Sequence, residues 1–243
     1  MVGARQVLKL ITEGDIESED VLVVSEDHNE QAQTLIALGA IGSVVWSLES
    51  PMYIPWFYED LPRIRRKYKR QMLFSGGSDS ISFPVFEEFD EELFNFPKTK
   101  DIVCVQSNKW NFEAPNELHS ERQRQLTKYI AEGRLDLFGK GFNEIDDKYG
   151  LVKNYAYSLC IENVEMPGYQ TEKAIDAMLC GSVPIYRGPK EHTLQGLVTN
   201  SPDLSSTELE AMRLRIKEWL SCEENPHRNK NFAKKLISCI LDQ

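Results

Sequence analysis

The sequence predicts an α/β fold, and two observations support this prediction. Residues 157–161 are short, apolar and β-prone, residues 171–179 place apolar side chains on one helical face, and residues 183–186 form a second apolar strand. The same strand–helix–strand order occurs upstream, between residues 101 and 138. Parallel strands need a crossover connection, usually a helix, so both stretches predict parallel sheets with helices on their faces.

The N-terminal part shows a similar alternation. Residues 20–24 and 42–48 are predicted strands, and residues 6–12 and 28–38 are predicted helices. The best candidate for a domain boundary is the polar stretch 95–100, which contains a proline. We therefore expect three parts: an N-terminal α/β lobe (1–96), a second α/β lobe (97–204) and C-terminal helices (205–243).

The C-terminal part is predicted to consist of packing helices. Residues 205–222 have the pattern of an amphipathic helix, and Ser205 and Glu208 have the spacing of a capping box at its start. A final helix is expected over residues 232–240. We expect both helices to pack on the lobes.

Polar and charged side chains crowd the segment between the strand 157–161 and its helix. They are Glu162, Asn163, Glu165, Tyr169, Glu172 and Lys173. Ligands of open parallel sheets bind at the carboxyl ends of strands, and the free N–H groups of a helix start favour an anion. A lysine in the first turn opposes the helix dipole by about 0.3–1 kcal/mol, a penalty that a bound phosphate would reverse. The alternative is an ordinary solvated turn before a helix.

Three blocks follow one another in this region: YAYSLCIEN, GYQTEK and VPIYRG. Their order and spacing resemble the donor-site motif of the α1,3/4-fucosyltransferases, glycosyltransferase family 10. The chain departs from the usual pattern at Ala156, where a lysine is common, and at Arg187, where Trp or Leu is usual. The resemblance extends from about residue 44 to residue 188. It implies the GT-B type of α/β fold, with two Rossmann-like lobes facing a cleft.

The resemblance also implies what the second lobe binds. The donor would be a nucleotide diphosphate sugar, GDP-fucose, with the first lobe on the acceptor side. Tyr169 would lie against the nucleotide, Glu172 would bond its ribose, and Lys173 would neutralise the pyrophosphate. Glu162 and Asn163 would shape the pocket.

A second segment, SNKWNFEAPNELHSERQRQL, resembles the Ser-Asn block of the family and the arginine that grips the donor pyrophosphate. Asn108 belongs to this block, and Arg122 is our assignment for the arginine, with Arg124 as the competing choice. A guanidinium group suits phosphate oxygens because its donors form a planar fork. The following segment LDLFGKGF matches a further block, in which Gly139 and Gly141 would let the backbone approach the ligand.

Glu49 is the candidate catalytic base. It lies in WSLESP, just after the predicted strand 42–48, and resembles the glutamate before Ser-Pro that the family is proposed to use. Sugar transfer to a hydroxyl needs a group that takes the hydroxyl proton, and a positioned carboxylate contributes roughly 10²–10⁴-fold. The alternative is an exposed glutamate before a turn proline.

Composition narrows the class of protein. The net charge of −10 argues against a general binder of nucleic acid or anionic membranes. One basic run, residues 63–70, is predicted to be an amphipathic helix with a solvated basic face. Contact of this run with an acidic acceptor, a lipid headgroup or nucleic acid is the alternative. Five cysteines without paired ligand spacing predict buried, reduced thiols rather than disulfides or a zinc site.

Targeting and metal signals are weak. The first residues lack a charged-then-apolar leader, and no apolar run approaches about 18 residues, so we expect a cytoplasmic enzyme of bacterial or viral type. The sequence contains no Asp-x-Asp, and Asp146 and Asp147 are adjacent. A divalent metal is therefore possible but not implied, and no cofactor is required besides the donor.

The sequence therefore predicts an inverting fucosyltransferase that moves fucose from GDP-fucose to a hydroxyl of a glycan. Two alternatives stay open. One is a GT-B transferase that uses another sugar nucleotide, because no motif reads the sugar. The other is a catalytically inactive GDP-binding module, because the first lobe is short for the family.

Overall fold

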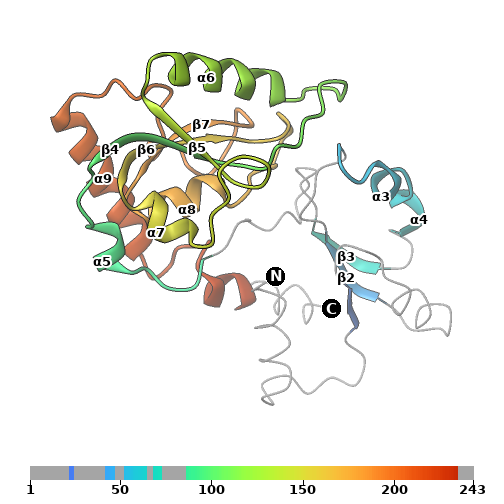
Figure 1. Ribbon diagram of the computed structural model, residues 1–243. Coiled ribbons are helices and arrows are strands. Elements are labelled where there is room, and N and C mark those ends of the chain that lie inside the picture. Colours follow the sequence, from blue (N-terminus) through green and yellow to red (C-terminus); the bar gives the residue numbers. More distant parts are fainter. Residues whose placement is uncertain (1–21, 25–41, 47–51, 65–67, 73–85, 235–243) are drawn as a thin grey trace. The chain divides into compact units, whose positions relative to one another are not determined.

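The computed structural model describes residues 22–24, 42–46, 52–64, 68–72 and 86–234 (Figure 1). The chain divides into two compact units, residues 1–87 with 226–243, and residues 88–225. Each unit is described by itself. The functional boundaries predicted near residues 97 and 205 stay a prediction.

The first unit contains a parallel sheet, as the alternation in the N-terminal part predicts. Its described strands are β1 (Leu22–Val24), β2 (Gly42–Trp46) and β3 (Tyr68–Met72), in the order β1-β2-β3. Two short helices, α3 (Pro55–Glu59) and α4 (Leu61–Ile64), lie between β2 and β3 in the sequence. The strands predicted over 20–24 and 42–48 are therefore confirmed, whereas the helices predicted over 6–12 and 28–38 lie outside the described residues.

The basic run does not form the single helix that its spacing predicts. Arg63 and Ile64 end α4, whereas Tyr68 already belongs to β3 and pairs with Gly42 of β2. The prediction of one helix over 63–70 is therefore wrong. The i,i+4 spacing of two apolar residues is a weak signal, and pairing with a neighbouring strand outweighs it.

The second unit carries most of the described structure. Its elements, in chain order, are α5 (Glu91–Phe94), β4 (Lys100–Val105), α6 (His119–Ala131), β5 (Leu135–Phe138), α7 (Lys148–Val152), β6 (Tyr155–Ile161), α8 (Lys173–Leu179), β7 (Val183–Arg187) and α9 (Ser206–Ser221). The strands and helices predicted for this part are confirmed. The short helices α5 and α7 have no counterpart among the predictions.

The sheet of the second unit is parallel throughout, in the order β5-β4-β6-β7. The chain leaves β4 toward β5 on one side and later leaves β6 toward β7 on the other side. Accordingly α6 covers one face of the sheet, and α7 and α8 cover the other (Figure 1). The carboxyl ends of β4 and β6 thus form a topological switch point, which is where open parallel sheets bind their ligands.

The central strand β6 is buried along almost its whole length, from Tyr155 at its start to Ile161 at its end. A strand covered on both faces reads as a nearly continuous apolar run, which is why the sequence reveals it so clearly. On α8, the side chains that face the core include Ala174, Ile175 and Met178, all fully or almost fully buried. Burial against both helical layers therefore fixes the end of β6 in place.

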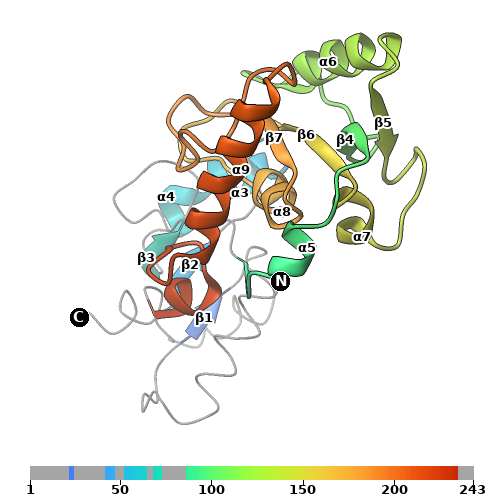
Figure 2. The same cartoon turned by 90° about the vertical axis from the view of Figure 1, so that its left-hand side faces the viewer.

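The helix α9 begins as the sequence predicts. Ser205 accepts a hydrogen bond from the backbone N–H of Glu208, and the Glu208 side chain accepts from the backbone N–H of Ser205. The helix packs beside β7, with Ile216 and Leu220 buried (Figure 2). The final helix predicted over 232–240 lies mostly outside the described residues. Among the residues that are described, no helix has the length and apolar character needed to cross a membrane.

Three of the four cysteines that the structure describes are buried thiols, as predicted. Cys104, Cys160 and Cys180 are free and buried, and Cys222 is free and exposed. Burial raises the pKa of Cys104 to about 12, so its thiol stays protonated at neutral pH. These thiols therefore serve packing rather than nucleophilic chemistry.

Candidate functional site

Glu162 is the centre of the site. It follows the last residue of β6, and its side chain is completely buried, with 0% exposure. One carboxylate oxygen, Oε1, accepts from the backbone N–H of Thr171 at 2.7 Å and from the Tyr186 hydroxyl at 3.3 Å. The other, Oε2, accepts from the Thr171 hydroxyl at 2.7 Å and from the Lys173 ammonium at 3.0 Å. Both oxygens of a buried carboxylate are thus satisfied.

This arrangement explains where α8 begins. The predicted helix starts at Thr171, but the observed helix starts at Lys173. Thr171 uses both its backbone N–H and its hydroxyl on Glu162, so these groups hold the preceding loop against β6 instead of entering the helix. The carboxylate therefore connects the end of β6 to the entry of α8.

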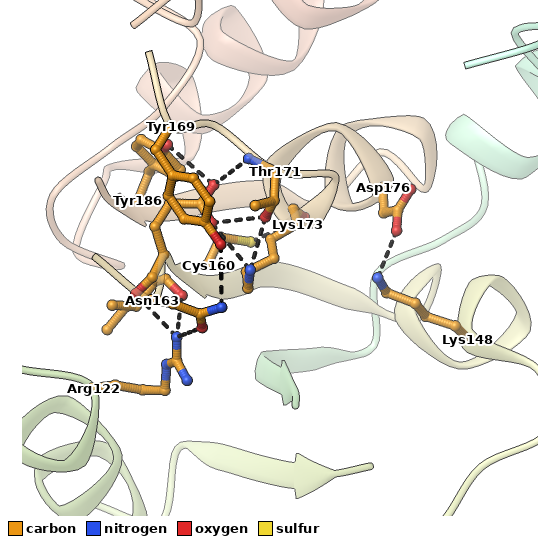
Figure 3. Close-up of polar contacts among 11 residues, drawn as sticks. Arg122, Lys148, Cys160, Asn163, Tyr169, Thr171, Lys173, Asp176 and Tyr186 are labelled. Carbon is orange, nitrogen blue, oxygen red and sulfur yellow. Dashed lines mark hydrogen bonds and ion pairs between the residues drawn. The ribbon is translucent and has the colours of Figure 1, made fainter. Parts of the chain in front are cut away.

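Lys173 lies in the first turn of α8 and points toward the end of β6 (Figure 3). Its ammonium contacts Glu162 at 3.0 Å and the Thr171 hydroxyl at 2.7 Å. The carboxylate offsets the unfavourable position of a cation at a helix N-terminus. The lysine side chain is mostly buried, with 22% of its surface exposed.

Arg122 reaches the same place from the other face of the sheet. It lies in the first turn of α6 and is buried, with 4% exposure. Its Nη2 donates to the backbone oxygens of Ile161 and Glu162 at 2.7 and 3.0 Å, and to Asn163 Oδ1 at 2.8 Å (Figure 3). Arg124, the competing choice, has a side chain that is 70% exposed and pairs with Glu121. The geometry therefore brings Arg122, and not Arg124, to the end of β6.

Asn163 and Tyr169 form the next layer. Asn163 accepts from Arg122 through Oδ1 and donates through Nδ2 to the Tyr169 hydroxyl at 3.3 Å. Tyr169 is buried, with 1% exposure, so its ring does not offer an open face. Glu172, the residue immediately before α8, is exposed. In this structure Asn163 holds the arginine and Tyr169 holds Asn163, whereas Glu172 is exposed.

A small pocket of about 30 Å³ lies at the switch point between β4 and β6. Its lining includes three cationic side chains from three different helices: Arg122 of α6, Lys173 of α8 and Lys148 of α7. Figure 3 shows Arg122 and Lys173 near the end of β6, and Lys148 turned toward Asp176. A volume of this size holds a water molecule or a small charged group, and not a whole nucleotide. The pocket is therefore a candidate anion site at the edge of a larger binding surface.

Lys148 was missed by the sequence analysis. Its ammonium lies 2.6 Å from Asp176 of α8, which also accepts a hydrogen bond from the Tyr149 hydroxyl at 2.9 Å. Burial alone would lower the pKa of Lys148, but Asp176 outweighs this effect and raises it, so the lysine is charged. No motif marks a lone lysine in an unpredicted helix, and only the packing of α7 against β6 reveals it.

Gln106 also lines the pocket, directly after β4. Both polar atoms of its side-chain amide are buried, and neither has a hydrogen-bond partner among the residues that the structure describes. Buried amides without partners are rare and often mark the place of a ligand or an ordered water. The pocket thus combines positive charge with an unused donor and an unused acceptor.

The loop after β4 is held by the loop after β5. The backbone N–H of Asn108 donates to Lys140 at 2.8 Å, and Gly139 and Gly141 both have positive φ, +115° and +83°. A Cβ at Gly139 would lie 2.0 Å from the backbone oxygen of Gln106. These glycines permit a close approach, and in this structure the approach is to the neighbouring loop.

Two predicted site residues need separate statements. Glu49, the candidate base, lies outside the described residues. Asn108 is exposed, and its side-chain oxygen accepts a hydrogen bond from the indole N–H of Trp110 at 2.6 Å. Within the described part of the chain, no three His, Cys, Asp or Glu side chains are grouped as metal ligands would be.

Comparison with known proteins decides the family. The model of the family described as "Glycosyltransferase family 10 (fucosyltransferase) C-term" matches residues 96–229, more than half of the chain. The chain belongs to glycosyltransferase family 10. The matched residues include β4 to α9 and thus the whole described site.

Individual relatives of this family 10 chain are distant. It is 30% identical over 152 residues to a putative fucosyltransferase-like protein of Arabidopsis thaliana, a match that covers 60% of this chain and 28% of the relative. It is 27% identical over 109 residues to the human 4-galactosyl-N-acetylglucosaminide 3-alpha-L-fucosyltransferase 9, covering 44% of this chain and 29% of the relative. The matches thus span less than a third of the length of these curated relatives.

Solved structures agree on the fold. A crystal structure of an alpha1,3-fucosyltransferase superimposes with a TM-score of 0.54 at 15% identity, covering 97% of this chain and 84% of the other. A structure of an alpha1,3-fucosyltransferase with GDP gives a TM-score of 0.52 at 14% identity, with the same coverage. The predicted α/β fold of the GT-B type is thereby confirmed.

Proposed function

We propose that this family 10 chain is a glycosyltransferase that moves fucose from GDP-fucose to a hydroxyl of a glycan, with inversion at the anomeric carbon. One observation carries the proposal. Arg122, Lys173 and Lys148 approach one pocket at the switch point of a parallel sheet, where a diphosphate would find both positive charge and the amide of Gln106. Membership of the family and the names of the relatives support the donor and the reaction.

The proposed chemistry uses this charge when the donor breaks. As the acceptor oxygen forms its bond to the anomeric carbon, the bond from that carbon to the phosphate oxygen breaks, and its electron pair stays on the departing GDP. Fixed cations aimed at this growing charge are usually the largest single contribution to such catalysis. Because Glu162 and Asp176 hold Lys173 and Lys148 in place, little reorganisation is needed when the charge appears.

The remaining site residues take supporting roles in the proposal. Glu49 accepts the proton of the attacking hydroxyl. Glu172, which is exposed at the start of α8, bonds the ribose. Asn163 and Tyr169 orient Arg122 through their hydrogen bonds, so Tyr169 acts next to the nucleotide rather than as an open stacking surface. We also propose that no divalent metal is needed, so EDTA leaves the rate unchanged.

Donor binding is tested first, by isothermal titration of the full chain with GDP and with GMP. Replacing Lys173 with Met should weaken GDP binding by about 10- to 150-fold, because a charge-assisted hydrogen bond contributes roughly 1.5–3 kcal/mol. GMP binding should fall less, because GMP lacks the second phosphate. The matched control is Arg124→Ala, which removes an exposed cation from the same helix as Arg122. Equal losses for GMP and GDP, or a loss in the control, would contradict the assigned phosphate contacts.

Turnover is tested next, with labelled GDP-fucose and a panel of lactosamine and bacterial surface glycans. Competition with GDP-mannose and UDP-sugars determines whether fucose is the preferred sugar. The Glu49→Gln variant should lose at least 100-fold in kcat while keeping its affinity for GDP, because only the base is changed. The anomeric configuration of the product, read by NMR, tests inversion.

A second function is favoured by one specific observation. The family model matches residues 96–229, which contain the phosphate site but not Glu49, and this favours a module that binds GDP without turning over a donor. Such a module would bind GDP with the same dependence on Lys173, would transfer no label to any glycan in the panel, and would be unaffected by Glu49→Gln. The binding and turnover experiments together separate the two functions.

A further inference from the structure

The loop between β4 and α6 carries a pair of stacked aromatic rings. The ring centroids of Trp110 and Phe112 are 5.7 Å apart, and their planes differ by only 12°. Phe112 is 49% exposed although it has a stacking partner. We call Trp110 and Phe112 the aromatic pair. It exposes aromatic surface on the loop that follows β4.

A hydrogen bond to Asn108 and ring contacts with His119 hold the aromatic pair in place. Oδ1 of Asn108 accepts a hydrogen bond from the indole N–H of Trp110, with an N···O distance of 2.6 Å, and this bond fixes the plane of the ring. His119, which begins α6 and is completely buried, meets both rings edge-on, at centroid distances of 6.0 Å and 6.4 Å. His119 also makes a hydrogen bond to the backbone of Lys109. A surface organised before binding loses little entropy when a ligand arrives.

Helix α6 connects the aromatic pair to the proposed phosphate site, because His119, which contacts both rings, and Arg122 both lie on it. His119 and Arg122 are one helical turn apart on α6. Burial lowers the pKa of His119, and the positive charges of Arg122 and Lys173 lower it further, so both cations are within electrostatic range of the residue that supports the rings. One ligand could therefore contact the cations with its phosphates and the rings with a planar group.

We propose that the aromatic pair binds the purine base of the donor nucleotide by stacking. This inference rests on the proposed function, since it assumes that a phosphate of a nucleoside diphosphate binds at the cationic pocket while its base lies outside. A flat π-surface next to an anion site matches a molecule that joins a planar base to a diphosphate through one sugar. Tyr169 is buried, whereas Phe112 is 49% exposed and can be reached by a ligand. Stacking holds any base, so the aromatic pair supplies affinity and not base identity.

The experiment measures binding of three probes to the full chain by calorimetry: GMP, GDP and inorganic pyrophosphate. Trp110→Ala and Phe112→Ala should each weaken the binding of GMP and of GDP by the same factor, roughly tenfold, because stacking of one base on an aromatic ring contributes about this much to affinity. Pyrophosphate, which has no base, should bind with unchanged affinity. Trp110→Phe should keep most of the affinity, because it preserves an aromatic ring.

Leu214→Ala is the matched control, since Leu214 is an exposed apolar residue on α9, away from the rings. It should leave all three affinities unchanged. The Phe112→Ala variant also guards against misfolding, because the exposed half of this ring contributes little to packing, and a thermal melt confirms its fold.

Two results would overturn the inference while leaving the proposed function intact. One is a wild-type affinity for GMP and GDP in both alanine variants, with no change in the KM for the glycan acceptor. The other is the same wild-type nucleotide affinity with a raised KM for the glycan acceptor, which would mean that the rings bind a sugar. If the wild-type chain binds neither GMP, GDP nor pyrophosphate, the proposed function itself fails.

Discussion

Replacing Glu162 with Gln tests the central interaction of the site. The substitution keeps the shape of the side chain but removes its charge. Each carboxylate oxygen faces donors: Oε1 faces the Thr171 backbone N–H and the Tyr186 hydroxyl, and Oε2 faces the Thr171 hydroxyl and the Lys173 ammonium. The amide NH₂ of glutamine therefore meets a donor in either orientation, and Lys173 loses its counter-charge.

The magnitude follows from burial. Removing one partner of a buried ion pair costs about 3–5 kcal/mol, because the other charge stays in a poorly solvated place. Glu162 is 0% exposed and Lys173 is mostly buried, so the full range applies. We expect the free energy of unfolding, measured by urea denaturation followed by circular dichroism, to fall by this amount. The midpoint of thermal unfolding should fall by on the order of 10 °C.

Glu165→Gln is the matched control. It makes the same chemical change three residues further along, at an exposed side chain, and should shift the free energy of unfolding by less than about 0.5 kcal/mol. Combining Glu162→Gln with Lys173→Met should cost about 1–3 kcal/mol less than the sum of the two single changes, because the pair is then removed together. A Glu162→Gln variant within about 1 kcal/mol of wild type would refute the account of this site.

Two further predictions concern the supporting structure. Gly139→Ala should lower the free energy of unfolding, measured by urea denaturation, by well over 1 kcal/mol, because the new Cβ would lie 2.0 Å from a backbone oxygen. Gly133→Ala, also at positive φ but in open space, is the control and should cost about 1 kcal/mol. Similar losses in the two variants would contradict the role of the close approach. Burial lowers the pKa values of His119 and His192 below 6.5 in the folded chain. As pH falls, these histidines therefore bind protons at a higher pH in the unfolded chain than in the folded chain. The free energy of unfolding should therefore fall as pH is lowered from about 7.5 to 5.5, and equal stability at both pH values would contradict this expectation.

The site residues show how far sequence patterns reach. Glu162, Asn163 and Lys173 could be singled out because they follow a strongly apolar strand and precede a helix, so their place at the edge of the sheet follows from local periodicity. The preference for Arg122 over Arg124 could not be derived in this way, because both lie on one predicted helix. The choice depends on which side chain faces β6, and this depends on how the helix packs on the sheet.

Other parts of the site were invisible in the sequence for a similar reason. Lys148 lies in a five-residue helix with no periodic signal, and its importance comes from a carboxylate 28 positions away, Asp176. In the basic run 63–70, two apolar residues four positions apart are compatible with a helix but also occur by chance, so this spacing does not determine the structure. Pairing with a neighbouring strand decided that part of the chain.

The sequence by itself determined the α/β alternation of the chain, the family, and the segment in which the charged residues gather. These features depend on residues close together in the chain, whose periodicity and spacing survive without the fold. Only the tertiary structure decided which cations share a pocket and which aromatic rings stay exposed. Those properties depend on strand order and on the faces that helices cover, and contacts between distant residues leave no mark in a single sequence.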